Sequence, residues 1–299
     1  MKSPEDRNLI VEGFLSQVQD LPTIPYVVVQ IMERIQQPEP EIEELADLIM
    51  TDQVLTTQLL RMVNSAFYGL NRTVASVKET VIYLGLREIE NLIYSVTLTN
   101  TFEIDAPLLK RIRFWEHSFG CALYSRLIAK KLGYPGKEQA YLAGLLHDIG
   151  EVIIALHLYQ DFEKVVRLVK DDGKTFYQAE EEVLGINHTD LGSWLVDRWK
   201  LPSSLSNVIT YHHTLEKAGE EDALLVAIVR MADLVCLYHK LDFGYSEGES
   251  LTAEIVTVWR MLASKFPALA REDMQKFLEE CNEQISAVKN AVQMVYKDG

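Results

Sequence analysis

The chain has 299 residues, enough to bury one large or two modest hydrophobic cores, and its 48% hydrophobic and 24% charged content is typical of a folded globular protein. Its 29 basic and 44 acidic residues give a net charge of −15, which repels phosphate backbones and anionic membranes. Because the basic residues are scattered along the chain, we expect neither nucleic acid nor a membrane among its partners.

The first eight residues include acidic side chains and no apolar core of the length that a secretory signal needs. The apolar window 223–237 is interrupted by Arg230 and Asp233 and is shorter than the roughly 20 residues of a membrane-spanning helix. A cytoplasmic location is therefore expected. The three cysteines, Cys121, Cys236 and Cys281, form no CxxC pair, which predicts small buried groups in a reducing compartment.

The first hundred residues show apolar side chains at helical spacing, and no stretch alternates with a period of two for long. Pro22 and Pro25 set the entry to an early helix, Asp52 is placed to cap a helix, and Gly85 is placed to end one. The predicted helices are 9–19, 26–36, 42–49, 54–63, 77–84 and 87–99. This region is typical of a compact helical bundle, with its best boundary at residues 105–107.

From residue 108 the pattern stays helical and gains histidines. Gly133, Gly173 and Gly185 are placed to end helices. The predicted helices are 109–132, one around 141–151, 160–172, 175–184, one that begins at 187–190, one that follows Pro202, 223–239, 256–266 and 274–295. The acidic run Glu180–Glu182 is expected to form a solvated helix face.

His147 and Asp148 interrupt the apolar run 141–151, which we expect to be helical. An unpaired carboxylate buried there would cost several kcal/mol, so Asp148 needs a hydrogen-bond network or a cation. Neighbouring residues on a helix point about 100° apart. Both side chains can therefore flank one ion, and the second oxygen of Asp148 is free to bridge to another ion.

Other helices supply further candidate ligands for that cation, namely His117, His188, His212, His213 and Asp233. Imidazole combined with carboxylate suits iron, manganese, zinc or nickel better than calcium or magnesium. Each histidine taken singly is more often a hydrogen-bonded core or surface residue, and Asp233 could pair instead with Arg230, three residues earlier on the same helix face. His157 and His239 are assigned to packing or to the surface.

The ordered series His117, His147-Asp148-Ile149-Gly150, His188, His212-His213 and Asp233 resembles the ligand series of the HD superfamily of metal-dependent phosphohydrolases in its long, HD-GYP-like form. Additional motifs over roughly residues 15 to 240 resemble the HDOD family, the HD-related output domain of bacterial signalling proteins. These motifs are Leu21-Pro22-Thr23-Ile24-Pro25, Leu60 with Asn64-Ser65-Ala66-Phe67-Tyr68, Tyr83-Leu84-Gly85-Leu86, Leu184-Gly185-Ile186-Asn187-His188 and Trp199-Lys200-Leu201-Pro202.

The resemblance implies an all-α fold in which an N-terminal helical bundle, 1–107, packs against an HD-like bundle, 108–240, with a C-terminal helical extension, 241–299, packed back. It also implies one metal position at His117, His147, Asp148 and Asp233, and a second that shares Asp148 and adds His188, His212 and His213. One or two transition metal ions per chain are expected, iron or manganese first and zinc or nickel as alternatives.

The sequence departs from hydrolytic HD-GYP proteins in two places. Glu151 stands where those enzymes carry a lysine that can protonate the leaving oxygen, and no Gly-Tyr-Pro motif follows His213. The resemblance therefore implies a bacterial signal-transduction output or regulatory module that binds metal and acts through a signalling protein partner or a small phosphorylated ligand. The alternative is a metal-dependent phosphohydrolase acting on a nucleotide or cyclic nucleotide phosphoester, and no catalytic residue can be assigned.

Overall fold

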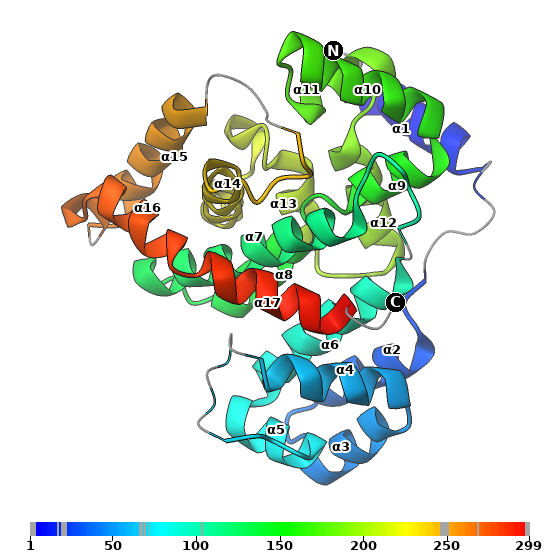
Figure 1. Cartoon of the computed structure of the whole chain (residues 1–299), viewed down its shortest axis with the longest axis vertical. Helices are drawn as coiled ribbons and strands as arrows, with labels where there is room; N and C mark the ends of the chain where they lie inside the picture. Colours follow the sequence, from blue (N-terminus) through cyan, green and yellow to red (C-terminus); the bar gives the residue numbers. More distant parts are fainter. Residues whose placement is uncertain are drawn as a thin grey trace. The chain divides into compact units, whose positions relative to one another are not determined.

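The computed structural model describes residues 4–16, 18, 23–65, 68, 70, 72–102, 104–245, 251–267 and 269–296. Every regular element in these ranges is a helix (Figure 1), so the predicted all-α class is confirmed. Leu21, Pro22, Ala66 and Phe67 of the resemblance motifs lie outside the described residues.

The chain forms two compact units that do not follow chain order. The larger unit contains Met1–Leu21 and Ile104–Glu283, and the smaller unit contains Pro22–Glu103 and Gln284–Gly299. The predicted division at residues 107 and 240 stays a prediction. The boundaries of the two units differ from that division, because the first helix belongs to the larger unit and the last helix belongs to the smaller one.

The smaller unit buries the apolar faces that the sequence pattern predicts. Its helices are α2 (Tyr26–Ile35), α3 (Ile42–Met50), α4 (Gln53–Val63), α5 (Val77–Leu84), α6 (Leu86–Thr101) and α17 (Ile285–Tyr296). The last helix packs against α4 although more than 200 residues separate them. Asn64, which follows α4, donates to the carbonyl of Val74 and accepts its N–H, both at 2.8 Å, so this motif residue fixes a loop.

The larger unit is organised around α7 (Arg111–Leu132), which packs against α8 (Lys137–Leu146) and α14 (Ala223–Tyr238). Its other α-helices are α1 (Pro4–Leu15), α9 (Ile149–His157), α10 (Tyr159–Asp172), α11 (Phe176–Val183), α12 (His188–Arg198), α13 (Ser203–Tyr211), α15 (Leu251–Lys265) and α16 (Met274–Asn282). The α12 helix packs against both α13 and α9. These contacts bring residues from five parts of the sequence to one interior region.

Local capping signals in the sequence form as expected. The Asp52 side chain accepts from the N–H groups of Val54 and Leu55 at the start of α4. Gly133 and Gly173 end α7 and α10 in the left-handed conformation, where a side chain would be strained. Asn187 forms a capping box with Asp190 at the start of α12.

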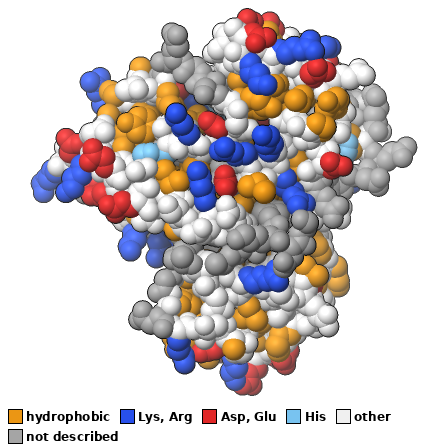
Figure 2. All heavy atoms as spheres, viewed as in Figure 1, with side chains coloured by type: hydrophobic (Ala, Val, Ile, Leu, Met, Phe, Trp, Pro, Cys, Tyr) orange, Lys and Arg blue, Asp and Glu red, His pale blue; other side chains and the backbone are white. Residues whose placement is uncertain are grey.

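By length and composition one described stretch, Lys137–His157, could cross a membrane. It is divided between α8 and α9, and 83% of its apolar window is buried inside the protein, as in the core helix of a folded domain. On the face shown in Figure 2, basic side chains are interspersed with acidic and apolar ones, as the scattered sequence positions predict.

Candidate metal centre

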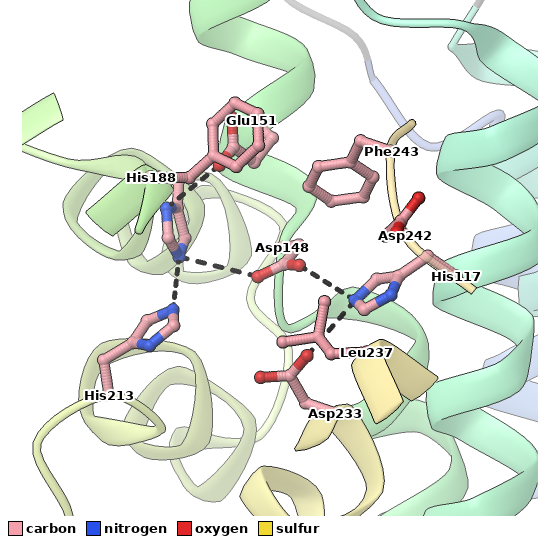
Figure 3. A pocket seen from close by; sticks show the side chains of 10 residues that line it. His117, Asp148, Glu151, His188, His213, Asp233, Leu237, Asp242 and Phe243 are labelled. Atoms are coloured by element: carbon pink, nitrogen blue, oxygen red, sulfur yellow. Dashed lines mark hydrogen bonds and ion pairs between the residues drawn. The ribbon is translucent and has the colours of Figure 1, made fainter. Parts of the chain in front are cut away.

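The seven predicted ligand residues come together inside the larger unit. Figure 3 shows His117, Asp148, His188, His213 and Asp233 among them. His117 lies on α7, His188 is the first residue of α12, and Asp233 lies on α14. Six of the seven are buried and His213 is half-buried. Their positions meet the geometric expectation, and their role as metal ligands stays a prediction.

The sequence suggested that His147 and Asp148 lie within one continuous helix, and this prediction was wrong. The α8 helix ends at Leu146, the pair forms a turn, and α9 begins at Ile149. The Asp148 backbone leaves helical geometry at φ −104° and ψ 14°, and its carbonyl accepts the N–H of Glu151 at 2.9 Å. Because the chain turns between α8 and α9, the side chains of His147 and Asp148 both face the interior region.

Gly150 allows α9 to approach the backbone that carries His188. A Cβ at Gly150 would overlap the carbonyl oxygen of His188 and lie 2.7 Å from its carbonyl carbon and 2.8 Å from the nitrogen of Gly192. A backbone this close excludes any side chain at the position. The glycine of the His-Asp-Ile-Gly run therefore sets the distance between the two halves of the centre.

Four of the histidines are held in one tautomer by oxygen acceptors. The Nδ1–H groups of His117, His147 and His212 donate to backbone carbonyls of Leu241, Gly144 and Ile209, at 2.7, 2.8 and 2.9 Å. His188 Nδ1 lies 2.7 Å from Glu180 Oε2. A carbonyl can only accept, so Nδ1 carries the hydrogen in these rings, and the lone pair of a neutral imidazole is on Nε2, facing the interior.

Asp148 lies between two groups of these Nε2 atoms. Its Oδ2 is 3.2 Å from His117 Nε2 and 3.0 Å from His147 Nε2, whereas its Oδ1 is 3.5 Å from His188 Nε2 and 3.4 Å from His212 Nε2. One carboxylate oxygen thus faces each group. The bridging arrangement that the sequence suggested is geometrically available.

The donor atoms fit a bound cation better than a purely protein network. His188 Nε2 lies 3.1 Å from His213 Nε2, a distance at which His213 Nε2–H can donate to His188 Nε2. His117 Nε2 lies 3.3 Å from His147 Nε2, and in both of these rings the hydrogen is on Nδ1. Two lone pairs facing each other at that distance need a proton or a metal ion between them. His212 Nε2 is buried without a well-directed hydrogen bond from any described residue, which also fits a site that supplies a cation.

The alternative partner considered for Asp233 is also present. Arg230 Nη1 donates to Asp233 Oδ2, and the same guanidinium binds Glu254 at 2.6 Å. The other oxygen, Asp233 Oδ1, lies 3.4 Å from His117 Nε2. Asp233 therefore contacts both the arginine and the centre, and Arg230 fixes the orientation of a carboxylate that faces the histidines.

One acidic prediction was wrong. Glu180 is fully buried, because α11 turns this position of the Glu180–Glu182 run inward beside Phe176 and Ala179. Its Oε2 accepts the backbone N–H of His188 at 2.9 Å as well as the ring Nδ1–H. Glu182 is exposed and pairs with Lys174.

Glu151, the residue at the expected lysine position, is also buried, with Oε1 3.3 Å from His188 Nδ1. Burial, reinforced by the negative charge of Glu180, raises the pKa of the Glu151 carboxyl well above its usual range. Both effects favour the neutral form of this carboxyl, at the position where the resemblance implies a lysine in hydrolytic HD-GYP proteins.

The two histidine groups have opposite protonation preferences without a metal. Burial by itself lowers the pKa of His147, but the charge of Asp148 outweighs it and raises that pKa to about 10. Burial lowers the pKa of His212 to about 4. The negative charge of Asp148 thus favours a protonated imidazole at His147, whereas burial favours the neutral form of His212.

The space inside the centre is small. Its cavity is about 20 Å³, room for roughly one water molecule or ion. Phe243 lies on one side of the cavity (Figure 3), and the centroid of its ring is 5.0 Å from that of the His117 ring and 5.6 Å from that of the Phe176 ring. The arrangement can hold small cations but leaves no room for a nucleotide.

Sequence reasoning missed Cys121, Glu180 and Phe243. Cys121 follows His117 by four residues, which puts both on one helix face. Glu180 follows Phe176 by four and Ala179 by one, so it occupies an inward position of the helical period. Phe243 is preceded by no pattern that predicts its place, because the loop after α14 is positioned by tertiary packing alone.

Comparisons with known proteins match these observations. The HDOD domain family model matches residues 21–215. An uncharacterized protein from Treponema pallidum (strain Nichols) is 26% identical over 271 residues, which is 90% of this chain and 52% of the relative. The chain thus spans about half the length of this curated relative.

Two solved structures share the fold over nearly the whole chain. An HDOD domain protein of unknown function from Geobacter sulfurreducens is 33% identical, with a TM-score of 0.83 and coverage of 98% of this chain and 99% of that one. A protein from Marinobacter aquaeolei VT8, provisionally named a signal transduction protein, is 20% identical, with a TM-score of 0.78 and coverage of 98% of this chain and 66% of that one. The chain belongs to the HDOD domain family.

Proposed function

We propose that the chain is a regulatory module of a signal-transduction system and that its interior centre binds transition metal ions as a structural element. The observation that carries this proposal is the small size of the centre, in which five of the seven histidine and aspartate side chains line a cavity of about 20 Å³ and the other two, His147 and His212, belong to the same donor groups. Small-molecule sites usually offer roughly 300–1,000 Å³. The name of the Marinobacter protein supports a signalling role for the shared fold.

Two features of the centre support a structural rather than a catalytic metal. Glu151 is buried beside His188 where a lysine would serve as a proton donor, and a carboxyl with a raised pKa carries no positive charge. The Phe243 ring meets the His117 ring edge to face, with the two centroids 5.0 Å apart, and covers the centre on that side. Structural metal sites are closed, whereas catalytic ones keep a position for water or substrate.

A metal-dependent phosphohydrolase is the second candidate. The observation in its favour is Asp148, which presents one oxygen to each group of histidines. A pair of bound metal ions would supply a polarised phosphoester and an activated water in such a site. This chain's residues would hold the pair, and the Phe243 ring would have to move for a phosphoester to enter.

Protein purified without chelator provides the test. We expect bound transition metal by elemental analysis, and hydrolysis of bis-p-nitrophenyl phosphate and of cyclic dinucleotides no faster than that of a His147→Ala variant. A His157→Ala variant serves as the control, because His157 lies outside the centre. Hydrolysis well above the His147→Ala rate would favour the phosphohydrolase, and a protein that neither contains nor takes up metal would contradict both functions.

A Phe243→Ala variant separates the two candidates further. Removing the ring opens the cavity, so a latent hydrolase would gain activity that depends on His147. We expect the regulatory module to stay inactive after this change and to keep its metal content.

A further inference from the structure

Cys121 is a buried thiol at the edge of the centre, one helical turn after His117 on α7. Its Sγ lies 3.5 Å from His117 Nε2, the same nitrogen that faces His147 and Asp233. Donor atoms of Cys121, His117, His147 and Asp233 all lie within 4.8 Å of one another. The thiol therefore belongs to the same cluster as three of the predicted ligands.

Three of the four separations given among these atoms match the edges of a tetrahedron around one ion, and the fourth, from His147 to Asp233, is longer. Zinc–nitrogen bonds of about 2.0–2.1 Å and zinc–sulfur bonds of about 2.3 Å give edges of about 3.3 Å between two nitrogens and about 3.6 Å between nitrogen and sulfur. The observed edges are 3.3 Å for His117 to His147, 3.5 Å for His117 to Cys121, and 3.4 Å and 4.0 Å from these two histidines to Asp233.

With Cys121 included, the donor residues form two sets of four. One set is His117, Cys121, His147 and Asp233, and the other is Asp148, His188, His212 and His213. Each set offers four donors, the number of ligands in a tetrahedral zinc site, and Asp148 Oδ2 also faces the first set. Asp148 remains between the two sets, with Oδ2 on the first and Oδ1 on the second.

We propose that Cys121 is a thiolate ligand of the first metal position, beside His117, His147 and Asp233, which suits that position to a thiophilic divalent ion such as zinc. The proposal rests on the metal binding proposed above. Thiolate donors select zinc or iron over manganese. On coordination the Cys121 sulfur forms a bond to the ion, and the thiol proton leaves to solvent.

Cobalt(II) is a suitable probe because it takes tetrahedral sites and reports sulfur ligation by a thiolate-to-cobalt charge-transfer band in the near ultraviolet. We expect this band in the metal-loaded natural protein and in a Cys281→Ser variant. Cys281 is the matched control, because it is a buried free cysteine outside the donor sets. In Cys121→Ser the band should be lost and cobalt affinity at this position should fall at least about tenfold, since even outer partners of metal ligands change affinity by roughly 10–100-fold.

Cadmium-113 NMR of the natural protein also tests for sulfur ligation, and it needs no substituted variant that could fail to fold. One resonance shifted downfield by sulfur ligation supports the proposal. Cobalt or cadmium that binds without any sulfur signature would overturn the role of Cys121 and leave the proposed metal centre intact. A protein that binds neither ion would overturn both proposals.

Discussion

Glu180 accepts both hydrogens of His188 that point away from the centre, the backbone N–H at 2.9 Å and the ring Nδ1–H at 2.7 Å, through the same Oε2 atom. A carboxylate behind a metal-binding imidazole fixes the ring and raises its basicity. The structure places this residue eight positions before the histidine, on the preceding helix.

Replacing this carboxylate should weaken the centre without removing a ligand. In Glu180→Gln the amide can still accept one hydrogen bond, but the charge assistance is lost, so we expect metal affinity to fall by roughly 10–100-fold. Titration calorimetry measures the change. Glu182→Gln is the control, because Glu182 is exposed and pairs with Lys174, and equal affinity in both variants would contradict the role of Glu180.

Metal binding should depend steeply on pH. The pKa of His147 is raised to about 10, so the metal-free protein carries a proton there at neutral pH that an incoming ion must displace. Between pH 6 and pH 8 we expect the apparent association constant to rise by about tenfold or more per pH unit. Calorimetry in buffers with different ionisation enthalpies should give at least one proton released per ion.

The same histidine predicts the pH dependence of stability without metal. Because the folded pKa of His147 lies above its unfolded value of 6.5, its contribution is fully present below about pH 6.5 and is lost as the pH rises toward about 10. Chemical denaturation of His147→Gln should therefore show a shallower decline in this window than the natural protein. Parallel curves would show that His147 is neutral in the metal-free fold.

A methyl group at Gly150 should disrupt the packing of α9 on α12. In Gly150→Ala the new Cβ would overlap the carbonyl of His188, and the backbone has little room to shift. We expect a loss of about 3 kcal/mol or more in the free energy of unfolding, as for severe overpacking. Gly13→Ala is the control, since a Cβ there meets nothing within 4 Å and alanine favours helix by up to about 1 kcal/mol.

The first helix should depend on one arginine for its attachment. The Arg7 guanidinium forms salt bridges with Glu181, at 2.7 Å, and with Asp190, and all three side chains are mostly buried. Arg7→Gln should cost about 1–2 kcal/mol and increase amide exchange over residues 4–15. Arg34→Gln, which breaks an exposed pair with Glu44, should cost less than about 1 kcal/mol, and an equal cost for both would contradict a special role for Arg7.

The link from Arg7 reaches the candidate metal centre through one residue, Asn187. Asp190 accepts the backbone N–H of Asn187 at 2.9 Å, and Glu181 accepts its side-chain amide at 3.2 Å. Asn187 immediately precedes His188. Release of α1 should therefore also lower metal affinity, an effect that calorimetry of Arg7→Gln can measure.

Much of the fold was predictable because it depends on local patterns. Helical spacing predicted most elements of both units, and residues such as Asp52 and Gly133 capped or ended helices as expected. The predicted helix 274–295 was wrong as one element, because the structure divides it into α16 in the larger unit and α17 in the smaller one. The family motifs identified the seven side chains that meet in the centre. These signals lie within short stretches of sequence, where periodicity and capping chemistry apply.

What the sequence did not predict depends on contacts between distant stretches. Glu180 was misassigned because its two acidic neighbours dominate the pattern of α11, although its place in the helical period is inward. The break at His147–Asp148 arises where α9 packs on α12, and no proline marks it. Phe243 reaches the centre only because the chain after α14 folds back over it.

The return of α17 to α4 has a consequence for synthesis on the ribosome. Val288 and Val292 of α17 are fully buried, so the smaller unit completes its core only when residues 285–296 have emerged. Domains generally fold as units while the chain is being made. The smaller unit can complete its core only after residues 104–283 of the larger unit have been translated, although most of its own residues emerge before them.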